Sequence, residues 1–219
     1  MKCFVIAMES EAAPLLKHVK IEREYKIGVK RIIVGKLFEK QVGVVICGVG
    51  KVNAACGAQY AIDVLGADVI INIGVAGGLN SSLKVGETYC ISHAVQYDFD
   101  LVQLNGTPMG TLNEFEERFL PLSTVNLYPL KKLGTGDRFN DDIKDYELLS
   151  KDMCADIRDM EGGAIVQACI HANVKVYSFK TISDLANSGS TTDQFLENLK
   201  VCTANMTQRI KEIWEAVNG

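Results

Sequence analysis

Four carboxylates of this sequence follow segments that have the composition of buried strands. They are Glu9, Glu11, Glu161 and Asp184. Because the carboxyl ends of parallel strands meet at one edge of a sheet, we expect acids from three separate segments to face one cleft. Capping of a helix start explains each acid singly, since the helix dipole favours Asp and Glu there. Taken together, the four acids favour a catalytic site.

Two carboxylates in unlike environments can break a bond at the anomeric carbon of a sugar. One acid protonates the departing group, and one base activates water on the opposite face. Other chemistries have less support. No Ser or Cys stands with a histidine in a nucleophile-elbow motif, and no acid has the spaced histidine partner of a transition-metal site; the histidines are His18, His93 and His171. We therefore expect glycosidic chemistry with no metal and no organic cofactor.

Two glycine-rich segments come directly after strand-like runs. Residues 48–51 read Gly-Val-Gly-Lys and precede a helical segment, so their amides either face an anion or a sugar or form a tight turn. They do not match a dinucleotide or phosphate loop, because Asn53 replaces the third glycine and Val52 follows the lysine. Residues 74–78 read Gly-Val-Ala-Gly-Gly and indicate either close approach to a ligand or a plain turn. Both segments are expected at the same edge of the sheet.

The elements that must position these residues alternate along the chain. Strands are expected at 3–8, 31–37, 42–47, 69–73, 88–93, 155–160 and 175–182, and helices at 9–18, 52–65, 113–120, 162–172 and 192–217. The last helix carries apolar residues at steps of three and four, and the stretch 97–129 is expected to be rich in loops. This order predicts one α/β domain over residues 1–219, with a central mixed, largely parallel twisted sheet flanked by helices.

Composition narrows the class of protein. The chain has 219 residues, 47% hydrophobic content and a net charge of −4, which is typical of a globular domain and gives no basic surface for nucleic acid. No segment is apolar for long enough to span a membrane, and the short apolar start is followed by acids where a signal peptide would continue. Seven scattered cysteines without a Cys-x-x-Cys spacing indicate reduced thiols in a cytoplasmic protein. The expected partner is a small molecule.

Five ordered blocks of this sequence resemble the nucleoside phosphorylase superfamily, and most closely its hydrolytic branch, the methylthioadenosine/S-adenosylhomocysteine nucleosidases. The blocks are Ala-Met-Glu-Ser-Glu at 7–11, Gly-Val-Gly-Lys-Val-Asn-Ala-Ala at 48–55, Ile-Asn-Ile-Gly-Val-Ala-Gly-Gly-Leu at 71–79, Asp-Met-Glu-Gly at 159–162 and Ile-Ser-Asp at 182–184. The resemblance covers nearly the whole chain and is weakest at 98–130. It implies a nucleoside phosphorylase-like fold, a purine nucleoside as substrate and no cofactor.

The resemblance also implies roles for individual residues. Glu11 matches the base that deprotonates the attacking water, and Asp184 matches the acid that protonates the five-membered ring of the purine. Met160 and Glu161 match the pair that binds the ribose. An ionised Glu161 beside the ribose would stabilise the positive charge of an oxocarbenium-like transition state, whereas Asp184 requires a raised pKa to stay protonated.

Further positions are expected to bind the substrate. Phe139 matches the aromatic residue that stacks on the base, and Asn140 would present backbone groups to the base edge. The expected set is completed by Val49, Val75 and Lys180. The last two depart from the family pattern, which has Ser and Arg there, and Arg and Lys are not equivalent donors. Thr192 also stands where an aromatic residue often lines the pocket for the 5′-substituent.

Three functions therefore remain open. The first is hydrolysis of a purine nucleoside such as methylthioadenosine, S-adenosylhomocysteine or a related adenine nucleoside. The second is phosphorolysis, which Glu11 would oppose by repelling phosphate and which Arg31 of a neighbouring subunit would favour. The third is nucleoside binding without catalysis. The resemblance implies a homodimer or a higher homo-oligomer. The composition indicates no nucleic-acid partner and no membrane partner.

Overall fold

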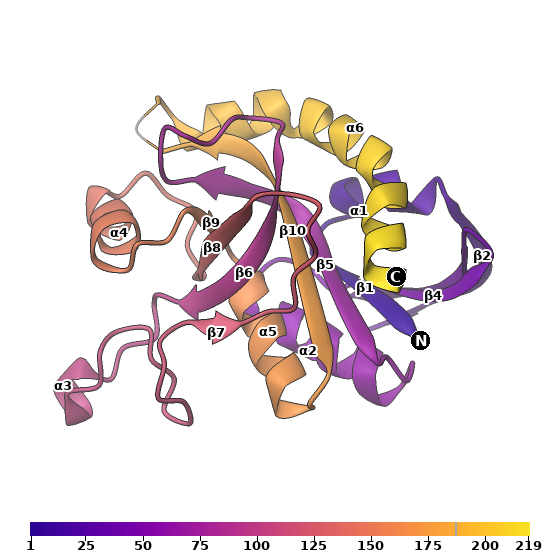
Figure 1. Cartoon of the computed structure of the whole chain (residues 1–219), viewed down its shortest axis with the longest axis horizontal. Coiled ribbons are helices and arrows are strands. Elements are labelled where there is room, and N and C mark those ends of the chain that lie inside the picture. Colours follow the sequence, from indigo (N-terminus) through magenta and orange to yellow (C-terminus); the bar gives the residue numbers. More distant parts are fainter. Residues whose placement is uncertain (187) are drawn as a thin grey trace.

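Strands and helices alternate through most of the chain in the computed structural model, which describes residues 1–186 and 188–219 (Figure 1). The strands are β1 (Lys2–Ile6), β2 (Val19–Ile27), β3 (Lys30–Leu37), β4 (Lys40–Ile46), β5 (Val69–Gly78), β6 (Thr88–Gln96), β7 (Leu120–Pro121), β8 (Leu130–Thr135), β9 (Ile157–Asp159) and β10 (Lys175–Leu185). The helices are α1 (Glu9–Leu16), α2 (Lys51–Asp63), α3 (Val102–Asn105), α4 (Ile143–Glu147), α5 (Gly162–His171) and α6 (Thr191–Asn218), and a π-helical turn, η1 (Leu148–Asp152), follows α4.

All ten strands belong to one mixed sheet. Its order is β10-β6-β8-β9-β5-β1-β4-β3-β2, and β7 pairs with β6. Because β10 also pairs with β5, the strands β10, β6, β8, β9 and β5 close on themselves like a small barrel, from which β1, β4, β3 and β2 extend. Parallel pairings join β4, β1, β5 and β10 through the middle. The expected α/β class is confirmed, and the carboxyl ends of β1, β5 and β10 point the same way.

Two layers of helices cover the sheet (Figure 1). Side chains of β1 alternate between them: Cys3 and Val5 pack into one apolar cluster with α2 and α5, while Phe4 and Ile6 pack into another with α1 and α6. In the second cluster, Phe4 stacks on Trp214 of α6 with ring centroids 6.0 Å apart. The sheet is thus buried on both faces, as its near-continuous apolar strands require.

Most expected elements are present, and their differences have physical causes. The strand β2 was not expected because its sequence is charged and its side chains are mostly exposed, so it shows no apolar run. The helix expected at 113–120 is wrong, because that segment forms turns and bends and its last residue, Leu120, begins β7. An isolated segment of that length forms too few hydrogen bonds to offset the ordering of its backbone.

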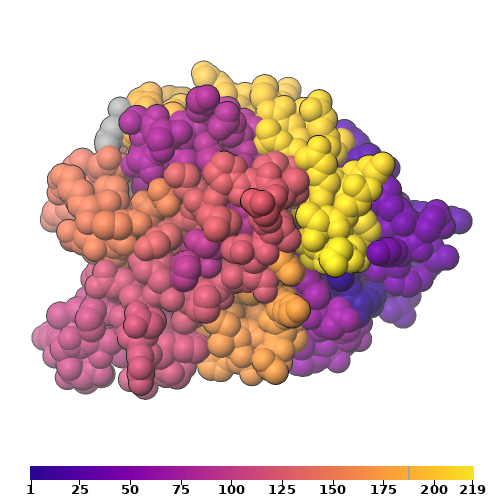
Figure 2. All heavy atoms as spheres, viewed as in Figure 1, coloured from indigo at the N-terminus to yellow at the C-terminus, as the bar shows by residue number. Residues whose placement is uncertain are grey.

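The stretch 97–129 is loop-rich, as expected, with only α3 and β7 as regular elements. Figure 2 shows this stretch on the outer surface of the face in view, in rose. No helix within the described ranges is both long and apolar enough to cross a membrane. Five of the seven cysteines are buried, and Cys56 and Cys154 are exposed.

Candidate active site

A cavity of about 490 Å³ opens where β1, β5, β9 and β10 end. Seven of the nine expected site residues line it: Glu11, Val49, Val75, Phe139, Met160, Glu161 and Asp184. The volume suits a nucleoside-sized ligand, since small-molecule sites commonly enclose about 300–1,000 Å³. Segments from both halves of the chain therefore meet in one hollow, as the positions of the acids had indicated.

Glu11 is anchored to two backbone amides. Its Oε2 accepts a hydrogen bond from the N–H of Met8 at 3.1 Å, and its Oε1 accepts one from the N–H of Val75 at 2.8 Å. The first bond caps the start of α1, so the Glu11 side chain both caps this helix and faces the cavity. The second ties α1 to β5. Burial raises the pKa of Glu11, although Lys180 and the two amides oppose the shift, and a raised pKa makes the carboxylate a stronger proton acceptor.

Asp184 reaches the cavity through an irregularity in β10. The pairing of β10 with β5 advances from Ile182 opposite Ala76 to Asp184 opposite Gly77, which leaves Ser183 as an extra residue. Such a bulge redirects the side chains that follow it. The hydroxyl of Ser183 donates to Oδ2 of Asp184 at 2.7 Å. Burial raises the pKa of Asp184, with the Ser183 hydrogen bond and Arg158 opposing it, so the carboxyl group holds a proton more readily than an exposed one.

Glu11 and Asp184 meet the same strand at separate points. Glu11 contacts β5 at Val75, and a Cβ on Gly74 would lie 2.7 Å from Glu11 Oε1. A Cβ on Gly77 would lie 2.8 Å from Asp184 Oδ1. Two or three residues along a strand correspond to about 7–10 Å. This is the scale that separates the acid and base of enzymes that attack a sugar from the face opposite the leaving group.

The glycines at 74–78 therefore do not form a turn, and they allow side chains to approach the backbone of β5 closely. The expected strand end at Ile73 is wrong, because β5 continues to Gly78. Any side chain on Gly74 or Gly77 would displace a carboxylate from the cavity. Close approach is therefore what this segment permits, and the groups that approach it are the carboxylates of Glu11 and Asp184. Approach of a ligand to this segment stays a prediction.

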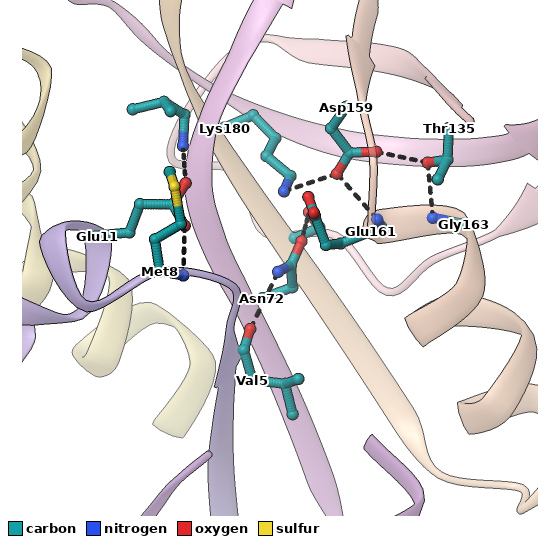
Figure 3. A network of polar contacts seen from close by, with 12 residues as sticks. Val5, Met8, Glu11, Asn72, Thr135, Asp159, Glu161, Gly163 and Lys180 are labelled. Carbon is teal, nitrogen blue, oxygen red and sulfur yellow. Dashed lines mark hydrogen bonds and ion pairs between the residues drawn. The ribbon is translucent and has the colours of Figure 1, made fainter. Parts of the chain in front are cut away.

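Glu161 lies beside a buried ion pair. Lys180 Nζ is 2.8 Å from Asp159 Oδ2, and both side chains are 2% exposed (Figure 3). Asp159 also accepts hydrogen bonds from Thr135 Oγ1 at 2.6 Å and from the N–H of Gly162 at 2.9 Å, which joins the pair to β8 and to the start of α5. Burial alone favours a neutral amine, but the surrounding carboxylates outweigh it, so the pKa of Lys180 is raised and the side chain stays charged.

The pKa of Glu161 is raised to about 7, first by burial and then by the neighbouring charge of Asp159. Its Oε1 accepts a hydrogen bond from the N–H of Gly50 at 2.9 Å. The amides at the start of α2 therefore face protein carboxylates, because Lys51 N–H also donates to Asp137 Oδ1 at 2.8 Å. The glycine segment at 48–51 thus positions Glu161, and its expected role as an anion site is filled from within the chain.

The opening of the cavity is apolar. Phe139 and Phe195 contact each other edge to face, with ring centroids 5.6 Å apart, and both line the cavity with Leu196. Phe139 is 51% exposed and Val49 is 46% exposed, so one side of the cavity faces solvent. Thr192 lines the same region at the start of α6. Two flat aromatic rings and aliphatic side chains suit a planar base and the apolar part of a substituent.

A family model described as the phosphorylase superfamily matches residues 2–215. The chain belongs to the phosphorylase superfamily. It is 31% identical, over 98% of both chains, to the 5′-methylthioadenosine/S-adenosylhomocysteine nucleosidase of Buchnera aphidicola. A nucleosidase of the same name from Colwellia psychrerythraea has been solved in complex with adenine. It is 28% identical to this chain, with a TM-score of 0.86, and the match covers 95% of this chain and 92% of the solved one. The futalosine hydrolase of Helicobacter pylori shares the fold at 23% identity, with a TM-score of 0.86 over 95% of each chain.

Two residues of this superfamily member that were expected to bind the substrate, Lys180 and Asn140, do not line the cavity. Lys180 was expected to touch the substrate, but it does not line the cavity, because its ammonium group is held by Asp159. Asn140 is also outside the lining: its Nδ2 donates to Asp145 at 2.8 Å and its Oδ1 accepts from Asp142 N–H at 3.1 Å. Glu9 points away as well and forms an ion pair with Arg31 at 2.6 Å. Neighbouring residues, which sequence spacing does not reveal, hold all three side chains. The expectation for Asn140 concerned its backbone groups, and these side-chain contacts leave that expectation as a prediction.

Other lining residues of this superfamily member were not expected from sequence. They include Arg158, Asp159, Phe195, Leu196 and Arg138. Successive side chains of β9 alternate between its two faces, and Ile157 is buried in the core. This alternation places Arg158 on the opposite face and could have been read from the sequence. None of the three histidines lines the cavity, and the described part of the chain holds no group of three or more His, Cys, Asp or Glu placed for a metal ion.

Proposed function

We propose that this member of the phosphorylase superfamily is a nucleosidase that hydrolyses the N-glycosidic bond of a purine nucleoside. The observation that carries the proposal is the placement of Glu11 and Asp184 at two points of β5 within one nucleoside-sized cavity. The substrate is 5′-methylthioadenosine, S-adenosylhomocysteine or a related adenine nucleoside, in line with the names of the similar proteins. The products are the free base and the free sugar.

In this mechanism, Glu11 accepts a proton from water while the water oxygen forms a bond to the anomeric carbon. The electron pair of the glycosidic bond passes to the purine, and Asp184 gives its proton to the five-membered ring. Both residues have pKa values raised by burial, which suits a base that must take up a proton and an acid that must hold one. General acid and base steps of this kind contribute about 10²- to 10⁴-fold each.

Glu161 stabilises the charge that develops on the sugar. Its ionised form faces the cavity, and ribose hydroxyls that donate to it would favour ionisation over the protonated form. The buried Lys180–Asp159 pair lies behind it and fixes the positions of β9 and β10. Lys180 is thus a positioning residue in this proposal, and Met160 lines the ribose region beside Glu161.

Water is favoured over phosphate as the nucleophile. The amide of Val75 is occupied by Glu11, whose negative charge would repel a phosphate. Arg31, the arginine considered for a phosphate subsite, is engaged by Glu9 at 2.6 Å and by Glu24 at 2.9 Å. Val75 lacks the hydroxyl group of the Ser in the family pattern, but its backbone amide still binds Glu11. The replacement of Ser by Val therefore does not favour a protein that binds nucleosides without catalysis.

Adenine release from 5′-methylthioadenosine tests the proposal. We expect the same rate with and without phosphate, and liberation of a reducing sugar in equal amount to adenine. The Asp184→Asn variant is the matched control, because it removes the acid and keeps the size of the side chain. An absolute requirement for phosphate would identify phosphorolysis, and tight binding without turnover would identify a binding protein.

Assembly and location belong to the same proposal. The apolar side chains of Val49, Phe139 and Leu196 are largely exposed at the cavity opening, where a second copy of the chain would cover them. This supports a homodimer or a higher homo-oligomer, and light scattering of the purified protein measures its mass. A reduced cytoplasmic compartment suits seven cysteines of which five are buried as thiols.

A further inference from the structure

Arg158 places a guanidinium group at the lining of the cavity. It lies in β9, directly opposite Gly77 of β5, and its side chain lines the cavity. Within residues 1–186 and 188–219, its guanidinium group forms no hydrogen bond and no ion pair. Arg138, the other arginine of the lining, differs because Asp145 holds it at 2.8 Å. A guanidinium group carries five N–H donors, so Arg158 offers a set of donors to whatever enters the cavity.

The side chains of Arg158 and Asp184 converge over Gly77. This glycine pairs with Arg158 on one side and with Asp184 on the other, so the three residues form a row across β9, β5 and β10. A Cβ on Gly77 would lie 2.8 Å from Asp184 Oδ1 and 3.2 Å from both Cγ and Nε of Arg158. The absence of a side chain at Gly77 therefore lets the two groups reach the same space.

Arg158 lies close to Asp184, the proposed acid, and this indicates which part of a bound nucleoside Arg158 would contact. Asp184 is the group that protonates the five-membered ring of the base, and the substituent at the 6-position lies on the same edge of a purine. An oxo group at that position accepts hydrogen bonds, as guanine O6 does beside N7 when arginine reads it. An amino group there is a donor and offers nothing to a guanidinium group.

We propose that Arg158 reads the 6-position of the purine and extends the activity of this site to 6-oxopurine nucleosides. The inference rests on the proposed function, because Asp184 must face the base. Arg158 lies at the Gly77 end of β5, away from the point where Glu11 meets Val75, so it is remote from the attacking water. It is accordingly assigned to the base and not to the nucleophile.

The test compares substrates that differ only at the 6-position. For 5′-methylthioinosine and 5′-methylthioadenosine, kcat/KM is measured in the natural protein and in the variants Arg158→Met and Arg158→Lys. We expect the natural protein to hydrolyse both nucleosides. Arg158→Met is expected to lower the inosine-to-adenosine ratio by about 10- to 100-fold, the scale of one hydrogen bond to a charged group. Arg158→Lys, which keeps the charge, is expected to retain part of the ratio.

Arg138→Met is the matched control, because it removes a cavity arginine that is already paired with Asp145. It is expected to leave the ratio unchanged, whatever it does to the overall rate. An equal loss for both nucleosides in Arg158→Met would overturn the inference. So would a change in the ratio of S-adenosylhomocysteine to 5′-methylthioadenosine instead, because Arg158 would then read the 5′-substituent.

Binding of the free bases separates this inference from the proposed function. Calorimetry with hypoxanthine and adenine needs no turnover. Hypoxanthine is expected to bind about 10- to 100-fold more weakly to Arg158→Met than to the natural protein, with a smaller change for adenine. If no nucleoside is hydrolysed but this difference is found, the inference stands and the hydrolytic function fails. If hydrolysis is found without the difference, the reverse holds.

Discussion

Replacement of Glu161 by Gln should stabilise the protein at neutral and alkaline pH while it impairs catalysis. Glu161 is buried beside Asp159, and its pKa is raised from 4.5 to about 7. A carboxyl group with a raised pKa in the folded state favours folding below its unfolded pKa, and this contribution is lost as the pH rises through the folded pKa. The natural protein therefore loses stability through this group between pH 4.5 and about 7.

The size of the effect follows from the two pKa values. A pKa rise from 4.5 to about 7, at about 1.36 kcal/mol per unit, corresponds to about 3 kcal/mol above pH 7. Gln keeps an oxygen that accepts the Gly50 amide but never ionises. The free energy of unfolding of Glu161→Gln, relative to the natural protein, should thus rise by about 1–3 kcal/mol between pH 5 and pH 8.

Urea unfolding at pH 5 and pH 8 measures this difference. Trp214 is the single tryptophan of the chain and is buried against Phe4, so its fluorescence reports on the folded core. Glu9→Gln is the matched control, because it removes a carboxylate from an exposed ion pair with Arg31. Exposed ion pairs of this kind contribute less than about 1 kcal/mol to the free energy of unfolding. The reasoning is refuted if Glu161→Gln gains no stability between the two pH values, or if it is the less stable protein at pH 8.

Four other outcomes follow from the same site. Asp184→Asn should lower kcat by about 10²- to 10⁴-fold while urea unfolding stays cooperative, and near-normal turnover would contradict its role as the acid. Glu11→Gln should abolish base release but change the dissociation constant of 5′-methylthioadenosine by less than about tenfold, as calorimetry would measure, because its task is to activate water. Lys180→Met should destabilise the fold by about 3–5 kcal/mol in urea, since Asp159 would remain buried without its cation, whereas Lys180→Arg should retain most of the stability. The pH profile of kcat/KM should rise through about 7 as Glu161 ionises, and this limb should be absent in Glu161→Gln.

Sequence patterns predicted the strands that are apolar and failed to predict strands that carry charged residues. The runs that became β1, β4 and β5 are buried on both faces and could be read directly. The strands β2 and β8 carry many charged residues, and pairing with neighbours rather than local preference makes them strands. The failed helix at 113–120 shows the converse, since a local helical preference was not supported by packing.

The sequence by itself determined which chemical groups reach the sheet edge. Glu11 follows β1 and Asp184 lies near the end of β10, and the parallel pairing of β1, β5 and β10 brings these two acids to one edge of the sheet. Glu161 joins them in the cavity from the end of β9, which runs antiparallel to β5. Only the tertiary structure decided how each group is held. The bulge at Ser183 aims Asp184, and the pairing of Asp159 with Lys180 keeps that lysine away from the substrate. Register and burial depend on contacts between distant segments, and those contacts leave no local trace in a single sequence.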